Sequence, residues 1–77
     1  MDVDVQEALE SGRRELDAGR NKEALRALTG TVFEADADQV GAIRRLAEEG
    51  RGTAGLFGRL GWSEIIRLAD LRLRTAA

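Results

Sequence analysis

The chain has 77 residues, of which 43% are hydrophobic and 34% are charged, and its formal net charge is −2. This composition predicts a folded domain rather than a disordered chain, and the length allows one domain with a small core. The absence of cysteine excludes disulfides and thiolate metal sites, so a bound partner or a second copy is the available additional support for the fold.

The first predicted element is an amphipathic helix that begins at Val5 and ends before Gly19. Its apolar residues recur at the spacing of three and four that places them on one helix face. Asp4 and Glu7 have the spacing of an N-terminal capping box. Gly19 suits the left-handed backbone conformation that ends a helix.

A second helix is predicted from Asn21, as its cap, to about Ala35. The connection to the first helix is only a few residues, so we expect the two helices to lie antiparallel and in contact. A third helix is predicted to begin at Asp36 or Asp38 and to end at Gly50.

Residues 50–61 are rich in glycine and are predicted to form either a mobile connection or a close approach of helices, with at most a short helical turn inside it. The last helix is predicted from about Ser63 to Thr75. Together the elements predict an all-α fold, a small four-helix bundle that forms a single domain over residues 1–77. Residues 4–38 are its first hairpin and residues 39–77 its third and fourth helices.

The first hairpin also has a characteristic set of residues at its turn and where its two helices pack closely and cross: Ala8, Gly12, Gly19, Ala24 and Leu28. In these residues, and in the turn that follows Gly19, residues 4–38 resemble a tetratricopeptide repeat, a helix-turn-helix unit of about 34 residues. The resemblance implies an antiparallel hairpin and a role in binding proteins. Residues 39–77 do not repeat the pattern, and the groove of that family needs about three stacked units.

The residue inventory disfavours catalysis, because the chain has no histidine, cysteine or tyrosine to act as a general base or thiol nucleophile. Residues 50–55 match the G-x-G-x-x-G dinucleotide motif, but no strand is predicted before them. Glu34, Asp36 and Asp38 alternate, and we interpret them as helix caps rather than metal ligands. We therefore expect no enzyme activity, no cofactor and no metal.

The last helix is more apolar than one buried face requires, because Leu68 and Leu71 widen its hydrophobic surface. Either these leucines pack on Leu56–Leu60 of the same chain, or the helix forms the interface of a dimer. Our leading hypothesis is a small bacterial protein-interaction or adaptor domain that binds a protein partner or itself. The candidate contact residues are Phe57, Leu60, Trp62, Leu68 and Leu71.

The alternative hypothesis is a nucleic-acid-binding regulator, because charge is distributed unevenly. Residues 1–38 carry ten acids and five bases, and residues 39–77 carry four acids and seven bases. The candidate nucleic-acid contacts are Arg44, Arg45, Arg67, Arg72 and Arg74. The negative net charge makes this alternative the less favoured one, because dedicated nucleic-acid binders are usually basic overall.

No apolar run approaches the roughly 18 residues of a membrane span. The acidic N-terminus lacks the pattern of a signal peptide, in which a charged start is followed by an apolar stretch. We therefore expect a cytoplasmic protein without a membrane span.

Overall fold

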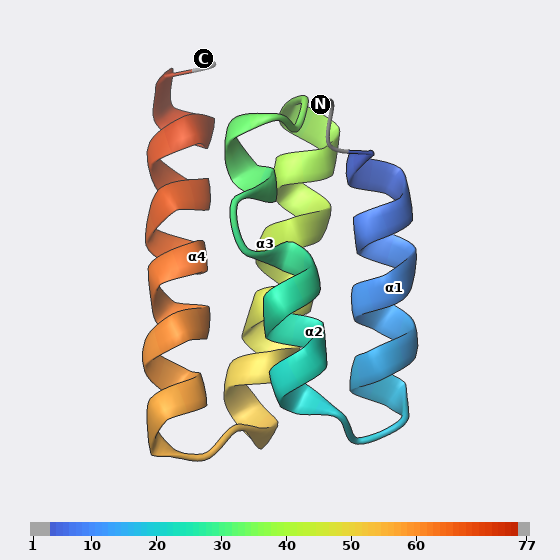
Figure 1. The fold of residues 1–77 in the computed structure, drawn as a ribbon. Coiled ribbons are helices and arrows are strands. Elements are labelled where there is room, and N and C mark those ends of the chain that lie inside the picture. Colours follow the sequence, from blue (N-terminus) through green and yellow to red (C-terminus); the bar gives the residue numbers. More distant parts are fainter. Residues whose placement is uncertain (1–3, 76–77) are drawn as a thin grey trace.

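The computed structural model describes residues 4–75, which form four α-helices and one short 3-10 helix: α1 (Val5–Asp17), α2 (Asn21–Leu28), η1 (Thr31–Phe33), α3 (Ala37–Thr53) and α4 (Leu56–Thr75). No strand occurs in that range. Each α-helix runs opposite to the one before it (Figure 1). The predicted all-α bundle is therefore confirmed. The ends of the predicted domain, residues 1–3 and 76–77, lie outside the described residues.

The helices form two packed hairpins, α1 with α2 and α3 with α4. In Figure 1 the helices α2 and α3 lie in the middle, with α1 and α4 on opposite flanks. The fully buried large side chains come from several elements and include Leu28, Val32, Val40, Ile43 and Trp62. Within residues 4–75, no helix combines the length and the apolar character needed to cross a membrane.

The start of α1 follows the prediction, because Asp4 is the N-cap and its Oδ1 accepts a hydrogen bond of 3.1 Å from the Glu7 amide. The chain turns at Gly19, which has a φ of 79°. Gly12 lies so close to α2 that a Cβ there would be 3.2 Å from Leu28. The predicted antiparallel hairpin is present, while its relation to the tetratricopeptide family stays a prediction.

The predicted end of the second helix is wrong, because α2 ends at Leu28 and not near Ala35. Gly30 adopts a left-handed conformation with a φ of 84°, which breaks the helix. The hydroxyl of Thr31 is buried and donates a hydrogen bond of 2.7 Å to the carbonyl of Leu28. The threonine hydroxyl thus provides a hydrogen bond to a carbonyl at the C-terminal end of α2, where carbonyls lack partners within the helix.

Of the two predictions for residues 50–61, the mobile connection is wrong, because most of the segment is helical, and the close approach of helices is present. The helix α3 continues to Thr53 and α4 already begins at Leu56, so that only two residues, Ala54 and Gly55, lie between them. Two helical glycines are explained by close packing. A Cβ at Gly50 would lie 2.6 Å from Cζ2 of Trp62, and one at Gly61 would lie 2.6 Å from Cδ2 of Leu25. Close packing thus compensates the cost of about 1 kcal/mol that each glycine imposes on a helix.

A hydrogen-bonded cluster fixes the start of α4 against α2 and α3. Asn21 Nδ2 donates 2.8 Å to the carbonyl oxygen of Gly50 and 3.2 Å to Oγ1 of Thr53. Asn21 Oδ1 accepts 2.9 Å from Nε1 of Trp62. The prediction that Asn21 caps the second helix is therefore wrong. Arg20 is the N-cap, and it makes no side-chain capping bond.

The other end of α4 is fixed by Arg72. Its Nη1 donates 2.6 Å to the carbonyl oxygen of Val32, and its Nη2 donates 2.9 Å to that of Ala35. Both carbonyls belong to the segment that contains η1 and leads to α3. Since α3 begins with a capping box between Asp36 and Gln39, this segment is held at both of its ends.

Candidate functional site

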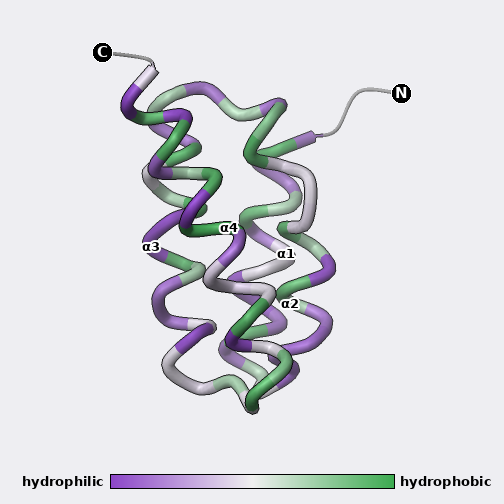
Figure 2. Tube along the Cα trace, turned by 90° about the vertical axis from the view of Figure 1, so that its left-hand side faces the viewer, coloured by the Kyte–Doolittle hydropathy of each residue, from purple (hydrophilic) through white to green (hydrophobic). Residues whose placement is uncertain are grey.

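The outer face of α4 carries the predicted contact residues that are most exposed. Phe57 is 84% exposed, Leu60 is 64% and Leu71 is 45%. The opposite face of the same helix is buried through Trp62, Ile65, Ile66 and Ala69, and it holds α4 against the core. Figure 2 looks onto the side of the molecule that α4 occupies, where its course alternates between hydrophobic and hydrophilic stretches.

Two other predicted contact residues lie differently. Trp62 is fully buried, so its place among the partner-contacting residues is corrected. Its spacing to Ile65, Ile66 and Ala69 places it on the buried face of α4. Its indole fills the space left by Gly50 and is hydrogen-bonded to Asn21. Leu68 is half-buried and packs against the core cluster, so it borders the outer face. The predicted packing of Leu68 on Leu56–Leu60 is wrong, because that segment belongs to the same helix, and Leu68 packs against the core instead.

Two exposed apolar residues were not among the predicted contacts. Leu56 is 73% exposed and extends the apolar surface at the start of α4, while Phe33 in η1 is 64% exposed. Phe33 was missed because residues up to 35 were expected to form a continuous helix. Leu56 was missed although it lies beside Phe57, which was named, between the same two glycines.

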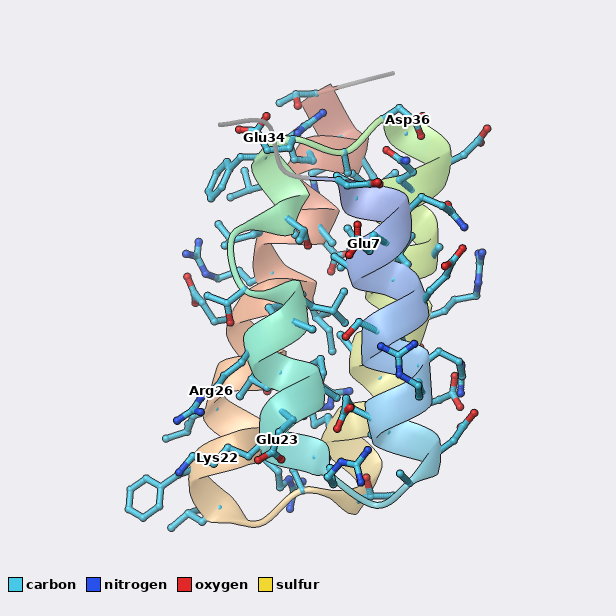
Figure 3. The ribbon with its side chains drawn as sticks, turned by 45° about the vertical axis from the view of Figure 1, so that its right-hand side comes forward. Glu7, Lys22, Glu23, Arg26, Glu34 and Asp36 are labelled. Atoms are coloured by element: carbon cyan, nitrogen blue, oxygen red, sulfur yellow. The ribbon has the colours of Figure 1, made fainter. Side chains whose placement is uncertain are left out.

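A hollow of about 390 Å³ adjoins the apolar start of α4, with this lining: Asn21, Lys22, Leu25, Gly55, Phe57 and Gly58. The exposed ring of Phe57 thus forms one wall, and the cationic side chain of Lys22 another. In Figure 3, Lys22, Glu23 and Arg26 lie together at this end of the molecule. The apolar surface of α4 therefore has a charged border, with two bases and one acid, where the helix begins.

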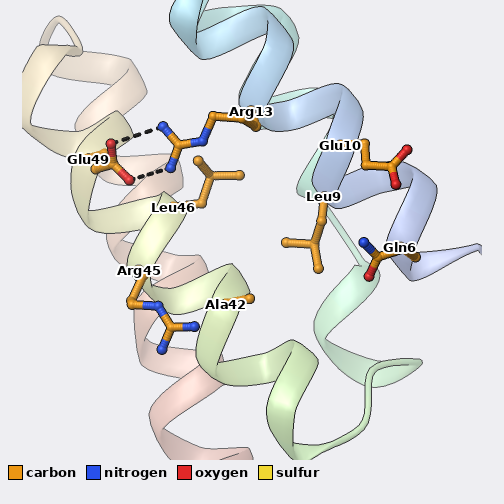
Figure 4. A pocket seen from close by; sticks show the side chains of 8 residues that line it. All are labelled: Gln6, Leu9, Glu10, Arg13, Ala42, Arg45, Leu46 and Glu49. Atoms are coloured by element: carbon orange, nitrogen blue, oxygen red, sulfur yellow. Dashed lines mark hydrogen bonds and ion pairs between the residues drawn. The ribbon is translucent and has the colours of Figure 1, made fainter.

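A second hollow of about 420 Å³ separates α1 from α3, and Figure 4 shows its lining: Gln6, Leu9, Glu10, Arg13, Ala42, Arg45, Leu46 and Glu49. Arg13 extends from α1 to α3 and forms a bidentate ion pair with Glu49, with an Nη1–Oε1 distance of 3.0 Å. The guanidinium of Arg13 lowers the pKa of Glu49 below its ordinary value, chiefly by hydrogen bonding. Because the two groups neutralise each other and tie the helices together, they offer little to a charged ligand.

The five arginines of the alternative hypothesis do not form one free cationic surface. Arg44 Nε donates 2.6 Å to Asp70, and Arg72 is bound to backbone carbonyls. Arg67 pairs with Glu64, with an Nε–Oε2 distance of 3.0 Å, and this pairing lowers the pKa of Glu64. Within residues 4–75, only Arg45 and Arg74 of the five lack an ion-pair or hydrogen-bond partner.

The carboxylates near the start of α3 act structurally. Asp36 Oδ1 accepts 2.8 Å from the amide of Gln39, which confirms its interpretation as a cap. Asp38 lies in the first turn of α3, where a negative charge is favourable. In the described part of the chain, no three acidic side chains come close enough together to hold a metal ion.

No family model matches the chain, and comparisons with curated proteins and with solved structures find no significant similarity.

Proposed function

We propose that this chain is a non-catalytic protein-interaction domain that binds a protein partner through the outer face of α4. The observation that carries the proposal is the exposure of Phe57, Leu60 and Leu71 on one face of a helix whose opposite face is firmly packed. Full burial of such a side chain contributes about 1.5–3 kcal/mol. The face therefore offers binding energy that the isolated chain does not use.

The rigidity of α4 supports the same role. Asn21 and Trp62 hold its beginning, and Arg72 holds its end, so the exposed face is presented without a large loss of conformational entropy on binding. The lack of histidine, cysteine and tyrosine further favours binding over catalysis. Because Arg44, Arg67 and Arg72 are engaged within the chain, a protein partner is favoured over nucleic acid.

The proposal is tested by photo-crosslinking in the native host. A benzoylphenylalanine replaces Phe57 in one variant and Asp38 in the control variant, because Asp38 is exposed but lies at the start of α3. We expect a protein adduct from position 57 that is absent from position 38. The adduct should be lost when Leu60→Glu is added, because a charge at the centre of an apolar contact must be desolvated.

Adducts of the same kind and yield at both positions, or none at position 57, would overturn the proposal. Circular dichroism of the Leu60→Glu variant is the control for folding. Leu60 is 64% exposed, so we expect its helix content to be unchanged.

A further inference from the structure

Six exposed residues of α4 follow one continuous stripe along the helix. From Phe57 to Arg74 they recur at alternating spacings of three and four residues, while the exposed Arg59 lies off the stripe. All of them are exposed, and they define what we call the seam: Phe57, Leu60, Glu64, Arg67, Leu71 and Arg74. This alternation is the pattern with which a helix packs along a second helix in a coiled coil.

When two copies of the seam run in opposite directions, each residue of one copy meets a residue of matching chemistry in the other copy. We infer that the occupant of this face is a second copy of the chain, with the two α4 helices packed antiparallel about a two-fold axis between Ile65 and Ile66. The inference rests on the proposed function and names its partner. In this register each seam residue of one copy faces a different seam residue of the other: Phe57 faces Arg74, Leu60 faces Leu71 and Glu64 faces Arg67.

A single antiparallel alignment of the two helices brings all three pairs together, because the two residues of each pair lie at equal distances from the same midpoint in the sequence. At the centre, Glu64 and Arg67 already pair within each helix, and two copies place these charges in a ring of alternating sign. Beyond the centre, the exposed leucines bury each other. At the ends, a guanidinium lies over the ring of Phe57, a favourable cation–π arrangement.

Repulsion between like charges also disfavours a parallel arrangement of the two α4 helices. Equivalent residues face each other in a parallel pair, so Glu64 would oppose Glu64, and Arg67 would oppose Arg67. Juxtaposed like charges disfavour association and thereby select the partner orientation. Polar residues within such a seam specify register and orientation while they weaken the pairing, so the dimer is reversible.

The charged residues on the flank of α4 where α2 and η1 pack also favour the antiparallel orientation. Lys22, Glu23 and Arg26, two bases and one acid, lie at one end of this flank and Glu34 lies at the other end (Figure 3). Both α2 and η1 contact α4. A two-fold axis that reverses α4 keeps this flank on the same side in both copies and thus brings the end with the two bases in one copy towards Glu34 of the second copy.

The test exchanges the central charges and follows the mass in solution by analytical ultracentrifugation. Glu64→Arg alone places two cations opposite each other in the dimer, and Arg67→Glu alone places two anions there. We expect each single variant to dissociate about tenfold more readily than the unaltered chain. An equimolar mixture of the two variants, and the double variant E64R/R67E, should recover the dimer, because opposite charges then face each other again.

A second measurement reports the register directly. The chain has no cysteine, so introduced thiols are unique. A mixture of Leu60→Cys and Leu71→Cys should form a mixed disulfide readily under mild oxidation, while each variant alone should form its own disulfide slowly. Rapid disulfide formation by Leu60→Cys alone would indicate a parallel pair and overturn the register.

The inference is overturned if the unaltered chain is a monomer up to about 1 mM, the concentration scale of an association free energy near 4 kcal/mol. It is also overturned if the single charge variants associate as well as the unaltered chain. An adduct at position 57 with a different protein only would contradict the inference while it supports the proposed function. Absence of any specific adduct, together with a monomeric chain, would contradict both.

Discussion

Asn21 Oδ1 accepts a hydrogen bond of 2.9 Å from Nε1 of Trp62 across 41 residues of sequence, and the same amide donates to the Gly50 carbonyl. One side chain therefore connects the start of α2 to the end of α3 and the beginning of α4. Since Trp62 is fully buried, its indole N–H has no access to water as an alternative partner. The position of the exposed face of α4 depends on this junction.

We expect Asn21→Ala to lower the free energy of unfolding by about 1–3 kcal/mol, because it leaves the buried indole N–H of Trp62 without its partner. Lys22→Ala is the matched control, since Lys22 is the exposed neighbour on the same helix and the substitution should change stability by less than about 0.5 kcal/mol. Urea unfolding followed by the fluorescence of the single tryptophan measures both. Equal stability of the two variants would contradict the role of the junction.

Gly50→Ala should destabilise the fold by about 1–3 kcal/mol, because the added methyl group would overlap the indole of Trp62. Gly52→Ala is the control two residues further along α3, where an added Cβ would meet no atom within 4 Å. In a helix that substitution should stabilise by about 0.5–1 kcal/mol. Chemical denaturation distinguishes the two, and a stabilised Gly50→Ala variant would refute the close packing.

Arg72→Met should destabilise the fold by about 1.5–3 kcal/mol, since hydrogen bonds from a charged donor to the carbonyls of Val32 and Ala35 are lost. Arg45→Met is a suitable control because Arg45 is exposed on α3 and has no partner in the described structure. Thermal unfolding measures the stability of both variants. Hydrogen exchange at residues 31–36 should rise in the Arg72 variant alone, and unchanged exchange there would contradict the anchoring role.

The ion pair between Arg13 and Glu49 predicts a specific dependence of stability on pH. Hydrogen bonding from Arg13 lowers the pKa of Glu49 in the folded chain, so the ionised form stabilises the fold. This contribution is fully present above the pKa of an unfolded glutamate, and it is lost as the pH falls through the lower pKa of the folded state.

Urea midpoints measured between about pH 7 and pH 3 should therefore fall less steeply for Glu49→Gln than for the unaltered chain. Glu10→Gln serves as the control from the same groove, because Glu10 forms no ion pair in the described structure. The effect should shrink at high salt, since both partners are largely exposed. Identical pH profiles for Glu49→Gln and the unaltered chain would refute the contribution of this pair.

The exposed face of α4 was predictable only in part. Phe57, Leu60 and Leu71 exceed the apolar content that one buried face needs, and this excess is visible in the sequence. Trp62 was named with these residues but is buried, since its spacing to Ile65 and Ala69 places it on the inner face of α4. Only the tertiary structure shows that its indole fills the space at Gly50. The seam emerges only when Leu56–Thr75 is recognised as one helix, since its first residues lie among glycines.

The sequence by itself determined the helical class, the start of α1 at Asp4 and the turn at Gly19, and it narrowed the cap of α3 to Asp36 or Asp38, because periodicity and capping are properties of neighbouring residues. Only the tertiary structure decided where α2 ends and that α3 and α4 include most of the glycine-rich residues. Local propensity counts each of those glycines against a helix. It cannot include the indole and leucine side chains, distant in sequence, whose close approach requires a residue without a side chain.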